Sequence, residues 1–440
     1  MTERTPFPRG MRAIVTFLFL CLACRAQHDM QQMPGMDMGP PSSAVPSQHA
    51  ASGTSVNPAS SPMDMIHKRL GAWTFMFHGV VFVADEQQTG PRGADKFFAP
   101  NWFMGTASHS AGRGSIEFRS MLSLDPATIT DRRYPLLFQT GETAFGKPLV
   151  DAQHPHDFVM ELSVRYTRPL TDSTSLLLYF APVGDPALGP VAFPHRVSAA
   201  EIPQATLSHH VQDSTHIAND VLTAALVRRS LRIEASGFHG GEPDELRWNI
   251  DHGAIDSWAT RLTWTPTDNW VGQVSVGRLT HPEAAEPGDV VRSTASLTYN
   301  RPLDNGNWAS SLIWGRNHKT AEQHNLNSYL AESVYQFKKM NYVTGRFELV
   351  DKDELFNDQP AIREHLDQTA GSTFRIAAYT LGYTRDVNLV PWLVTGIGGN
   401  FTVFGVPEAI RPYYGQHPAG FFFFLRARLK GSGGMAHMHH

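Results

Sequence analysis

The sequence predicts an all-β protein: a closed antiparallel transmembrane β-barrel of about 16 strands. Three observations predict it. Between residues 70 and 429, apolar and polar side chains alternate in many short runs, and the connections between these runs alternate between short and long. Aromatic residues also stand beside the short connections, as expected where a barrel crosses a membrane interface. The aromatic residues are Trp73, Tyr166, Trp264, Trp270, Tyr299, Trp308, Phe337, Tyr342, Tyr383 and Trp392.

The alternation itself identifies each strand. In residues 231–236, Leu, Ile and Ala occupy the odd positions and Arg, Glu and Ser the even ones, which places the two sets on opposite faces of a strand. A soluble sandwich or propeller could alternate in the same way, so this signal alone leaves that alternative open. The predicted strands are 72–84, 97–108, 115–124, 157–168, 174–181, 215–228, 231–238, 258–265, 269–279, 290–300, 307–315, 328–338, 341–350, 373–384, 389–404 and 419–429.

The order of the connections predicts how the barrel is oriented. Bacterial barrels have short periplasmic turns and longer outer loops, and their strand number is even. An even number of strands places both termini in the periplasm. The predicted long loops are 85–96, 125–156, 182–214, 239–257, 280–289, 316–327, 351–372 and 405–418.

The N-terminus reads as a secretory signal peptide over residues 1–26. Arg9 and Arg12 precede an apolar run over 13–23, which is too short to span a bilayer as a helix. A lipidated Cys24 is the alternative way of processing this end. Since the segment carries four arginines and one glutamate, its removal changes the net charge from −4 to about −7, which gives no reason to expect nucleic-acid binding.

Two segments outside the barrel are poor in large apolar residues. Residues 27–69 are predicted to be a disordered linker, and residues 430–440 a flexible tail, because neither can bury enough surface to offset the entropy of ordering. Both contain Met and His. The tail also resembles an expression tag.

The final strand, residues 420–429, alternates Phe, Leu and Ala with Arg. It resembles the terminal strand that the barrel-assembly machinery recognises in outer-membrane porins, and the architecture of residues 70–429 resembles porin-like barrels as a whole. The resemblance implies an outer-membrane location, lipid as the surrounding partner, a channel for small polar solutes, and one long loop (125–156 or 182–214) folded into the channel. It leaves open whether the protein is a homo-oligomer.

Strand parity predicts which charged residues line the channel. Arginines outnumber glutamates on the inward side, which favours a mild preference for anions. The predicted lining residues are Arg119, Arg165, Arg232, Arg261, Arg292, Arg346, Arg375, Glu117, Glu161, Glu234 and Glu348.

Methionine and histidine suggest a second role, in metal handling. Thioethers favour Cu(I), and imidazole binds both copper states. The Met- and His-containing linker before a barrel resembles the barrel component of bacterial copper-resistance systems, which implies copper ions as ligands. Histidines in the long loops could bind Zn(II) or Cu(II) if they converge. The candidate metal ligands are Met30, Met33, Met36, Met38, His154, His156, His209, His210, His437 and His439.

The sequence therefore predicts a passive porin-like channel that requires no cofactor. The alternatives are a metal-handling barrel for copper or silver resistance, and an outer-membrane enzyme. The enzyme alternative has little support, because the chain contains neither a Gly-x-Ser-x-Gly nor a His-Glu-x-x-His motif.

Overall fold

The computed structural model describes residues 49–62, 64–286 and 288–431. Contacts divide the chain into two units, residues 1–41 and 42–440, and all described residues lie in the second. The predicted signal peptide lies outside the described residues, as do the first part of the predicted linker and nearly all of the predicted tail. No helix among the described residues is long and apolar enough to cross a bilayer.

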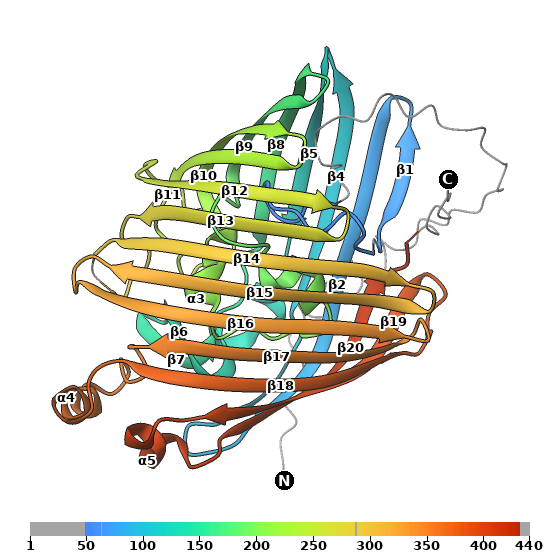
Figure 1. Cartoon of the computed structure of the whole chain (residues 1–440). Coiled ribbons are helices and arrows are strands. Elements are labelled where there is room, and N and C mark those ends of the chain that lie inside the picture. Colours follow the sequence, from blue (N-terminus) through green and yellow to red (C-terminus); the bar gives the residue numbers. More distant parts are fainter. Residues whose placement is uncertain (1–48, 63, 287, 432–440) are drawn as a thin grey trace, which may run out of the picture. The chain divides into compact units, whose positions relative to one another are not determined.

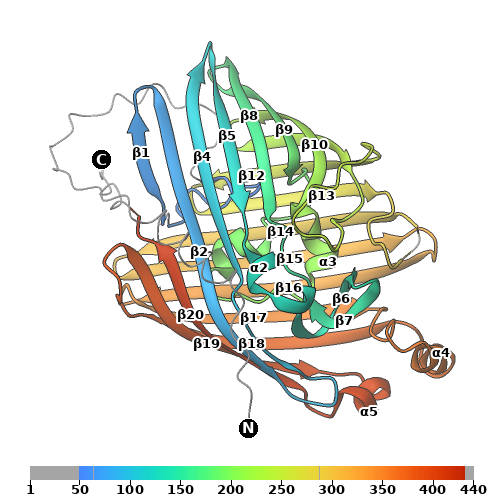
Figure 2. The ribbon, with the colours of Figure 1, turned by 180° about the vertical axis from the view of Figure 1, so that it is seen from behind.

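Sixteen antiparallel strands close into one barrel, as Figures 1 and 2 show, so the predicted fold class is confirmed. Each strand pairs with the next, and the last pairs with the first. Closure leaves no spanning strand with an open edge, which hydrocarbon would not tolerate. The strands of the ring are β2 (Trp73–Gln88), β4 (Asn101–Ala111), β5 (Gly114–Leu122), β8 (Val159–Thr171), β9 (Thr174–Gly184), β10 (Ala218–Arg228), β11 (Leu231–His239), β12 (Ser257–Thr267), β13 (Trp270–Leu279), β14 (Val290–Leu303), β15 (Gly306–Lys319), β16 (His324–Phe337), β17 (Asn341–Lys352), β18 (Phe374–Asp386), β19 (Leu393–Gly405) and β20 (Ala419–Leu429).

Strand β2 joins the two ends of the sheet. One edge of its second half pairs with β20, and the same edge of its first half pairs with β1 (Ile66–Leu70). Its other edge pairs with β3 (Asp95–Phe98) and β4. The sequence did not predict β1 or β3, because both are too short to show a clear alternation.

One predicted long loop is wrong. The connection expected over 316–327 is mostly strand, because β15 and β16 continue as a paired hairpin until only residues 320–323 join them. The end of β15 is polar on both faces, at Arg316 on the outside and Asn317 on the inside, so alternation could not reveal it.

The outer face of the barrel is apolar. Leu312, Ile233 and Leu381 point outward and are 60%, 64% and 65% exposed, and no second sheet among the described residues packs over them. Beside the short turns, the rings of Trp270, Tyr299 and Trp308 touch one another with centroids 4.5 Å and 5.5 Å apart. This is the exterior that an acyl-chain environment requires.

Tyr342 is an exception to the predicted aromatic ring. It is 5% exposed and points into the barrel, where its hydroxyl accepts a hydrogen bond from Arg428 and donates one to Asp386. Tyr342 lies beside a short turn, as predicted. It belongs to the inward-facing set of residues on β17, however, and closeness to a turn does not reveal which way a side chain points.

Helices and one hairpin belong to the connections rather than to the wall. Helix α3 and the hairpin β6–β7 lie within the ring of strands in both views of the ribbon, whereas α4 and α5 lie at the end where the long loops emerge (Figures 1 and 2). The elements are α2 (Asp125–Thr128), η2 (Thr130–Arg132), β6 (Tyr134–Ala144), β7 (Lys147–Gln153), η3 (Phe193–His195), η4 (Val197–Ala199), α3 (His209–Gln212), η5 (Ser214–His216), α4 (Pro360–Thr369), η6 (Glu408–Ile410) and α5 (Arg411–Tyr414).

An apolar core joins these connections to the wall. Phe138 of β6 stacks on Tyr414 of α5 at 4.3 Å and contacts Phe404 of β19 at 5.1 Å. Phe138 and Tyr414 are completely buried, and Leu355 and Phe374 belong to the same cluster. The long-loop end of the barrel is therefore packed like a domain core rather than left as an open vestibule.

Candidate functional site: the barrel interior

The wall presents charged side chains to the interior, as parity predicts. Each of these residues is buried or nearly buried, because other segments of the chain cover it. The predicted residues that face inward are Arg119, Arg165, Arg232, Arg261, Arg292, Arg346, Glu117, Glu161, Glu234 and Glu348.

The inward direction predicted for Arg375 is wrong. Its side chain is 54% exposed and contacts Asp351 at 2.7 Å, while its neighbours Phe374 and Ile376 point into the apolar core. Parity fails here because the inward side of β18 is apolar at this end of the barrel, so polarity no longer marks the interior.

Carboxylates pair with most of the inward arginines. Arg119 lies 3.0 Å from Glu117 and 3.4 Å from Glu161. Arg261 lies 2.9 Å from Glu234, and Arg346 lies 3.0 Å from Glu332. The wall therefore carries much less unbalanced positive charge than a count of arginines suggests.

The N-terminal part of the described chain lies inside the barrel. Residues 49–57 form a small closed loop, with an isolated bridge between Ala50 and Val56. Arg119 donates to the carbonyl oxygens of Ala51 (2.7 Å) and Gly53 (3.1 Å), and Arg232 donates to that of Thr54 (2.6 Å). This part of the predicted linker is therefore ordered by the wall.

Gly53 allows this loop to pack closely against its neighbours. Its φ is +54°, and a Cβ there would lie 2.2 Å from the carbonyl oxygen of Asp185. Only glycine combines that backbone conformation with so close an approach. Two hydrogen bonds hold this part of the loop. Ser52 donates to the Asp185 carboxylate at 2.7 Å, and the N–H of Gly53 donates to Glu161 at 3.1 Å.

The long connection between β9 and β10 also lies in the interior, as expected for a loop over 182–214. Arg196, which is 1% exposed, contacts Glu332 of β16 at 2.6 Å and Asp213 at 3.1 Å. Further along the loop, Ser208 donates to Glu348 of β17 at 3.0 Å. The inward loop is thus held to the wall by buried, charge-assisted hydrogen bonds.

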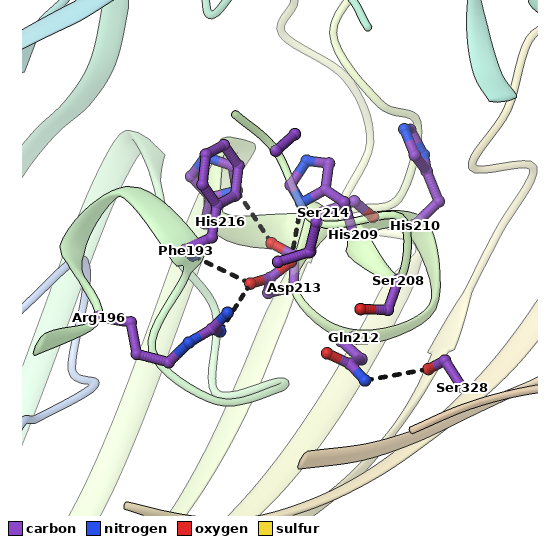
Figure 3. Close-up of polar contacts among 12 residues, drawn as sticks. Phe193, Arg196, Ser208, His209, His210, Gln212, Asp213, Ser214, His216 and Ser328 are labelled. Carbon is purple, nitrogen blue, oxygen red and sulfur yellow. Dashed lines mark hydrogen bonds and ion pairs between the residues drawn. The ribbon is translucent and has the colours of Figure 1, made fainter. Parts of the chain in front are cut away.

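Histidines gather on this inward loop. His209 and His210 lie side by side on α3, with ring centroids 5.2 Å apart, and His216 lies 5.3 Å from His209 (Figure 3). His154, from the end of the β6–β7 hairpin, lies 5.7 Å from His210. The nitrogen atoms of His154, His209 and His210 that could bind a metal lie within 4.8 Å of one another.

Hydrogen bonds fix the orientation of these rings. His209 Nδ1 donates to Asp213 at 2.7 Å, as Figure 3 shows, which leaves Nε2 as the free nitrogen of the ring. His154 Nδ1 bonds to the carbonyl oxygen of Pro155 at 3.1 Å, and His216 Nδ1 bonds to that of Asp213 at 2.9 Å. Each ring therefore presents its Nε2 atom.

Two carboxylates complete the cluster from other loops. His210 Nδ1 lies 3.5 Å from Glu242 and 3.3 Å from Glu283. The His210 ring rests against Gly141, where a Cβ would lie 2.5 Å from the ring. Glu283 was not predicted, because a lone glutamate in a loop carries no spacing signal.

Burial and these neighbours set the charge of the histidines. Burial lowers the pKa of His154 to about 3 and that of His209 to about 4, so both rings are neutral at pH 7. Burial also opposes protonation of His210, but the carboxylates of Glu242 and Glu283 outweigh it and raise the pKa of His210 to about 10. Imidazole binds metal ions in its neutral form. His154 and His209 are in that form at pH 7, whereas a metal ion bound at His210 must displace a proton.

The other predicted metal ligands do not join this group. His156 bonds through Nδ1 to Asp125 at 2.9 Å and lies nearest to His216, with ring centroids 5.7 Å apart. Of the predicted ligands, Met30, Met33, Met36, Met38, His437 and His439 lie outside the described residues.

The His209–Asp213 pair resembles the base and orienting acid of a hydrolase, but a nucleophile is also needed. No hydrogen bond joins a serine hydroxyl to the His209 ring in the part of the chain that the structure describes.

Comparison with known proteins places the fold. No protein-family model matches the chain, and no curated protein matches it. Among solved structures, it is similar to OprB of Pseudomonas putida (TM-score 0.51, 11% identity, covering 81% of this chain and 94% of that one). It is also similar to OmpF of Salmonella typhi (TM-score 0.50, 8% identity, covering 83% of this chain and all of that one). The chain therefore has the fold of the porin-like outer-membrane β-barrels.

Proposed function

We propose that the protein is an outer-membrane channel for small polar solutes whose lumen is obstructed by its own chain. The observation that carries this proposal is the placement of residues 49–62 and 185–217 against the charged inner wall. A wall lined with Arg, Glu, Ser and Thr suits a water-filled passage. Passage then requires one of the two inward segments to move.

The N-terminal segment is the better candidate for movement. It is a short loop near one end of the described chain, and it is held by hydrogen bonds to its backbone and to its Ser, Thr and Asn side chains. The inward loop, by contrast, is held by buried ion pairs such as Arg196–Glu332. Loss of a whole ion pair costs more than exchange of a carbonyl oxygen for water.

Conductance across a planar bilayer tests the proposal. The full-length protein should conduct weakly, and deletion of residues 49–62 should raise the single-channel conductance several-fold. Gly53→Val should act in the same direction, since a side chain there collides with Asp185. Gly71→Val is the control, because a Cβ at this turn has open space around it. Equal conductance in all four proteins would contradict the proposal.

We further infer that the channel discriminates little between anions and cations. The anion preference expected from the arginines on the strands is offset in part by carboxylates that the loops bring into the interior, such as Glu201, which pairs with Arg426 of β20. The reversal potential of the deletion variant in a salt gradient should therefore lie near zero. A large potential of either sign would refute this inference.

The direction of the barrel in the membrane follows from the same reasoning. We propose that the short turns face the periplasm and that both termini lie there, because outer loops are the longer ones in bacterial barrels. A cysteine introduced at the turn residue Ser230 should then react with a membrane-impermeant maleimide only in permeabilised cells.

A further inference from the structure

We propose that His154, His209 and His210, together with Glu242 and Glu283, form a binding site for a divalent transition-metal ion of the Cu(II) or Zn(II) class. The proposal does not depend on whether the barrel conducts solutes. It concerns a different part of the interior from the one occupied by residues 49–62.

The first argument is convergence. The ligand atoms of the three histidines lie within 4.8 Å of one another, and so do those of His210, Glu242 and Glu283. His210 belongs to both groups. These side chains come from four separate connections of the barrel, and pairing of the strands does not require the connections to meet at this point.

The second argument is the way in which the rings are held. His209 donates its Nδ1 proton to Asp213, and Asp213 is itself fixed by Arg196 and by the backbone N–H of Phe193. A carboxylate behind the Nδ1 atom of a histidine is the usual partner of a metal-bound imidazole, because it fixes the tautomer and raises the basicity of Nε2. The Pro155 carbonyl oxygen serves His154 in the same way.

The third argument is the presence of buried polar atoms without hydrogen bonds. His210 is 6% exposed, and neither of its ring nitrogens makes a hydrogen bond of good geometry. The same is true of both carboxylate oxygens of Glu242. Nε2 of His154 also makes no hydrogen bond of good geometry, although it lies 3.0 Å from the carboxylate of Glu142. Burial of such atoms is costly unless something satisfies them. An ion bound between them would satisfy one ring nitrogen of His210 together with Glu242 and His154.

The ligand set determines the class of ion. Three imidazole nitrogens with carboxylate oxygens suit Zn(II) and Cu(II), whereas Ca(II) and Mg(II) prefer oxygen atoms alone and Cu(I) prefers sulfur. A zinc–nitrogen bond is about 2.0–2.1 Å long, so two nitrogens on one ion can be at most about 4.2 Å apart. Small rotations of the three rings are enough to reach that separation.

A purely structural explanation also exists, in which His210 is an imidazolium clamped between Glu242 and Glu283. It predicts no metal binding at this site. Glu142, 3.0 Å from Nε2 of His154, accounts for the orientation of that ring, but this explanation leaves open why His209 is directed to the same place. Direct titration with a metal separates the two explanations.

The test uses the full-length protein in detergent, titrated with Zn(II) by calorimetry and with Cu(II) by electron paramagnetic resonance. Variants His154→Gln and Glu242→Gln should each lose one equivalent of Zn(II), or bind it at least about 100-fold more weakly. The nitrogen hyperfine pattern of bound Cu(II) should lose one nitrogen in His154→Gln. Met and His residues elsewhere in the chain contribute equally to every variant, so the difference isolates this site.

His252→Gln is the matched control. His252 also donates through Nδ1 to a carboxylate, that of Asp220, but its side chain is 61% exposed and lies outside the cluster. The His252→Gln protein should bind one more equivalent of Zn(II) than either of the two site variants. Far-UV circular dichroism must show that all the variants keep their strands. If folded His154→Gln and Glu242→Gln both bind Zn(II) and Cu(II) as the unmodified protein does, the site does not exist.

Discussion

Leu312 and Arg196 show how differently the two sides of this barrel are built. Leu312 stands on the outer face of β15 and is 60% exposed, whereas Arg196 is 1% exposed inside the ring, between Glu332 and Asp213. Many outward positions share one requirement, an apolar side chain toward acyl chains. Each inward position instead depends on a particular partner from another part of the chain.

The comparison teaches where stability and specificity reside. Strand pairing and the apolar exterior determine that a barrel forms, and most single changes there should be tolerated. The interior segments do not pair with the strands, but their buried ion pairs with the wall add to stability, and they decide what the lumen contains. The predictions below test this division, beginning with the largest expected effect.

Arg196→Ala should be the most damaging single change. It leaves the buried carboxylate of Asp213 without its guanidinium partner and leaves Glu332 with Arg346 alone. Removal of one partner from a buried ion pair costs about 3–5 kcal/mol. Urea unfolding in lipid vesicles should show this loss. Arg375→Ala removes an ion pair whose arginine is half exposed, although its partner Asp351 is largely buried, and should cost less, about 1 kcal/mol. Similar losses for the two variants would contradict the division between wall and interior.

Leu312→Arg should have the second-largest effect on the free energy of unfolding. A charge placed on the lipid-facing side of a barrel near the bilayer centre costs about 2–4 kcal/mol. The same unfolding measurement checks it, with Leu312→Val as the control that keeps the site apolar. If Leu312→Arg is tolerated as well as Leu312→Val, lipid does not cover this face.

Asp213→Asn should weaken metal binding at the histidine cluster by about 10- to 100-fold, the range typical for loss of the carboxylate behind a metal-bound imidazole. Zn(II) calorimetry on the full-length protein measures it. Asp220→Asn, which removes the same kind of partner from the exposed His252, should leave the affinity unchanged. Equal affinity in Asp213→Asn and the unmodified protein would argue against the ligand role of His209.

Tyr342→Phe should have the smallest effect of the four. It removes a hydroxyl that bonds to Arg428 and Asp386, at a cost of about 1–2 kcal/mol. Tyr383→Phe, on the outer face, should cost less because its hydroxyl makes one hydrogen bond, to Asn341. If Tyr383→Phe costs more stability than Tyr342→Phe, Tyr342 belongs to the outer ring of aromatic residues.

The sequence predicted the wall well because the wall depends on local alternation. All sixteen strands of the ring lie within a few residues of their predicted positions, including β11, where Leu231 and Ile233 face lipid and Arg232 and Glu234 face inward. Where the inward side becomes apolar, as around Phe374, the same rule gave the wrong face for Arg375. A period of two reports the contrast between the two faces and does not identify which of them is inside.

The interior could be predicted only in part, because its contacts join distant residues. Histidines 154, 209 and 210 could be named as candidates from the sequence, but their convergence depends on how two loops fold into the barrel. Nothing near Gly53 indicated that its backbone would contact Asp185, which lies 132 positions away. A segment poor in large apolar residues reads as disordered when its partners are arginines on a wall that forms only after folding.

A pair of cysteines provides the most direct test of the central claim that residues 49–62 lie within the barrel. Both natural cysteines, at positions 21 and 24, fall in the predicted signal peptide, so Ser52→Cys and Asp185→Cys would be the only thiols in the mature chain. The side chains of Ser52 and Asp185 approach to 2.7 Å. Mild oxidation of the protein in outer-membrane vesicles should therefore join the two cysteines and leave neither free to react with a maleimide. Two thiols that stay fully reactive after oxidation would mean that the segment is outside the barrel.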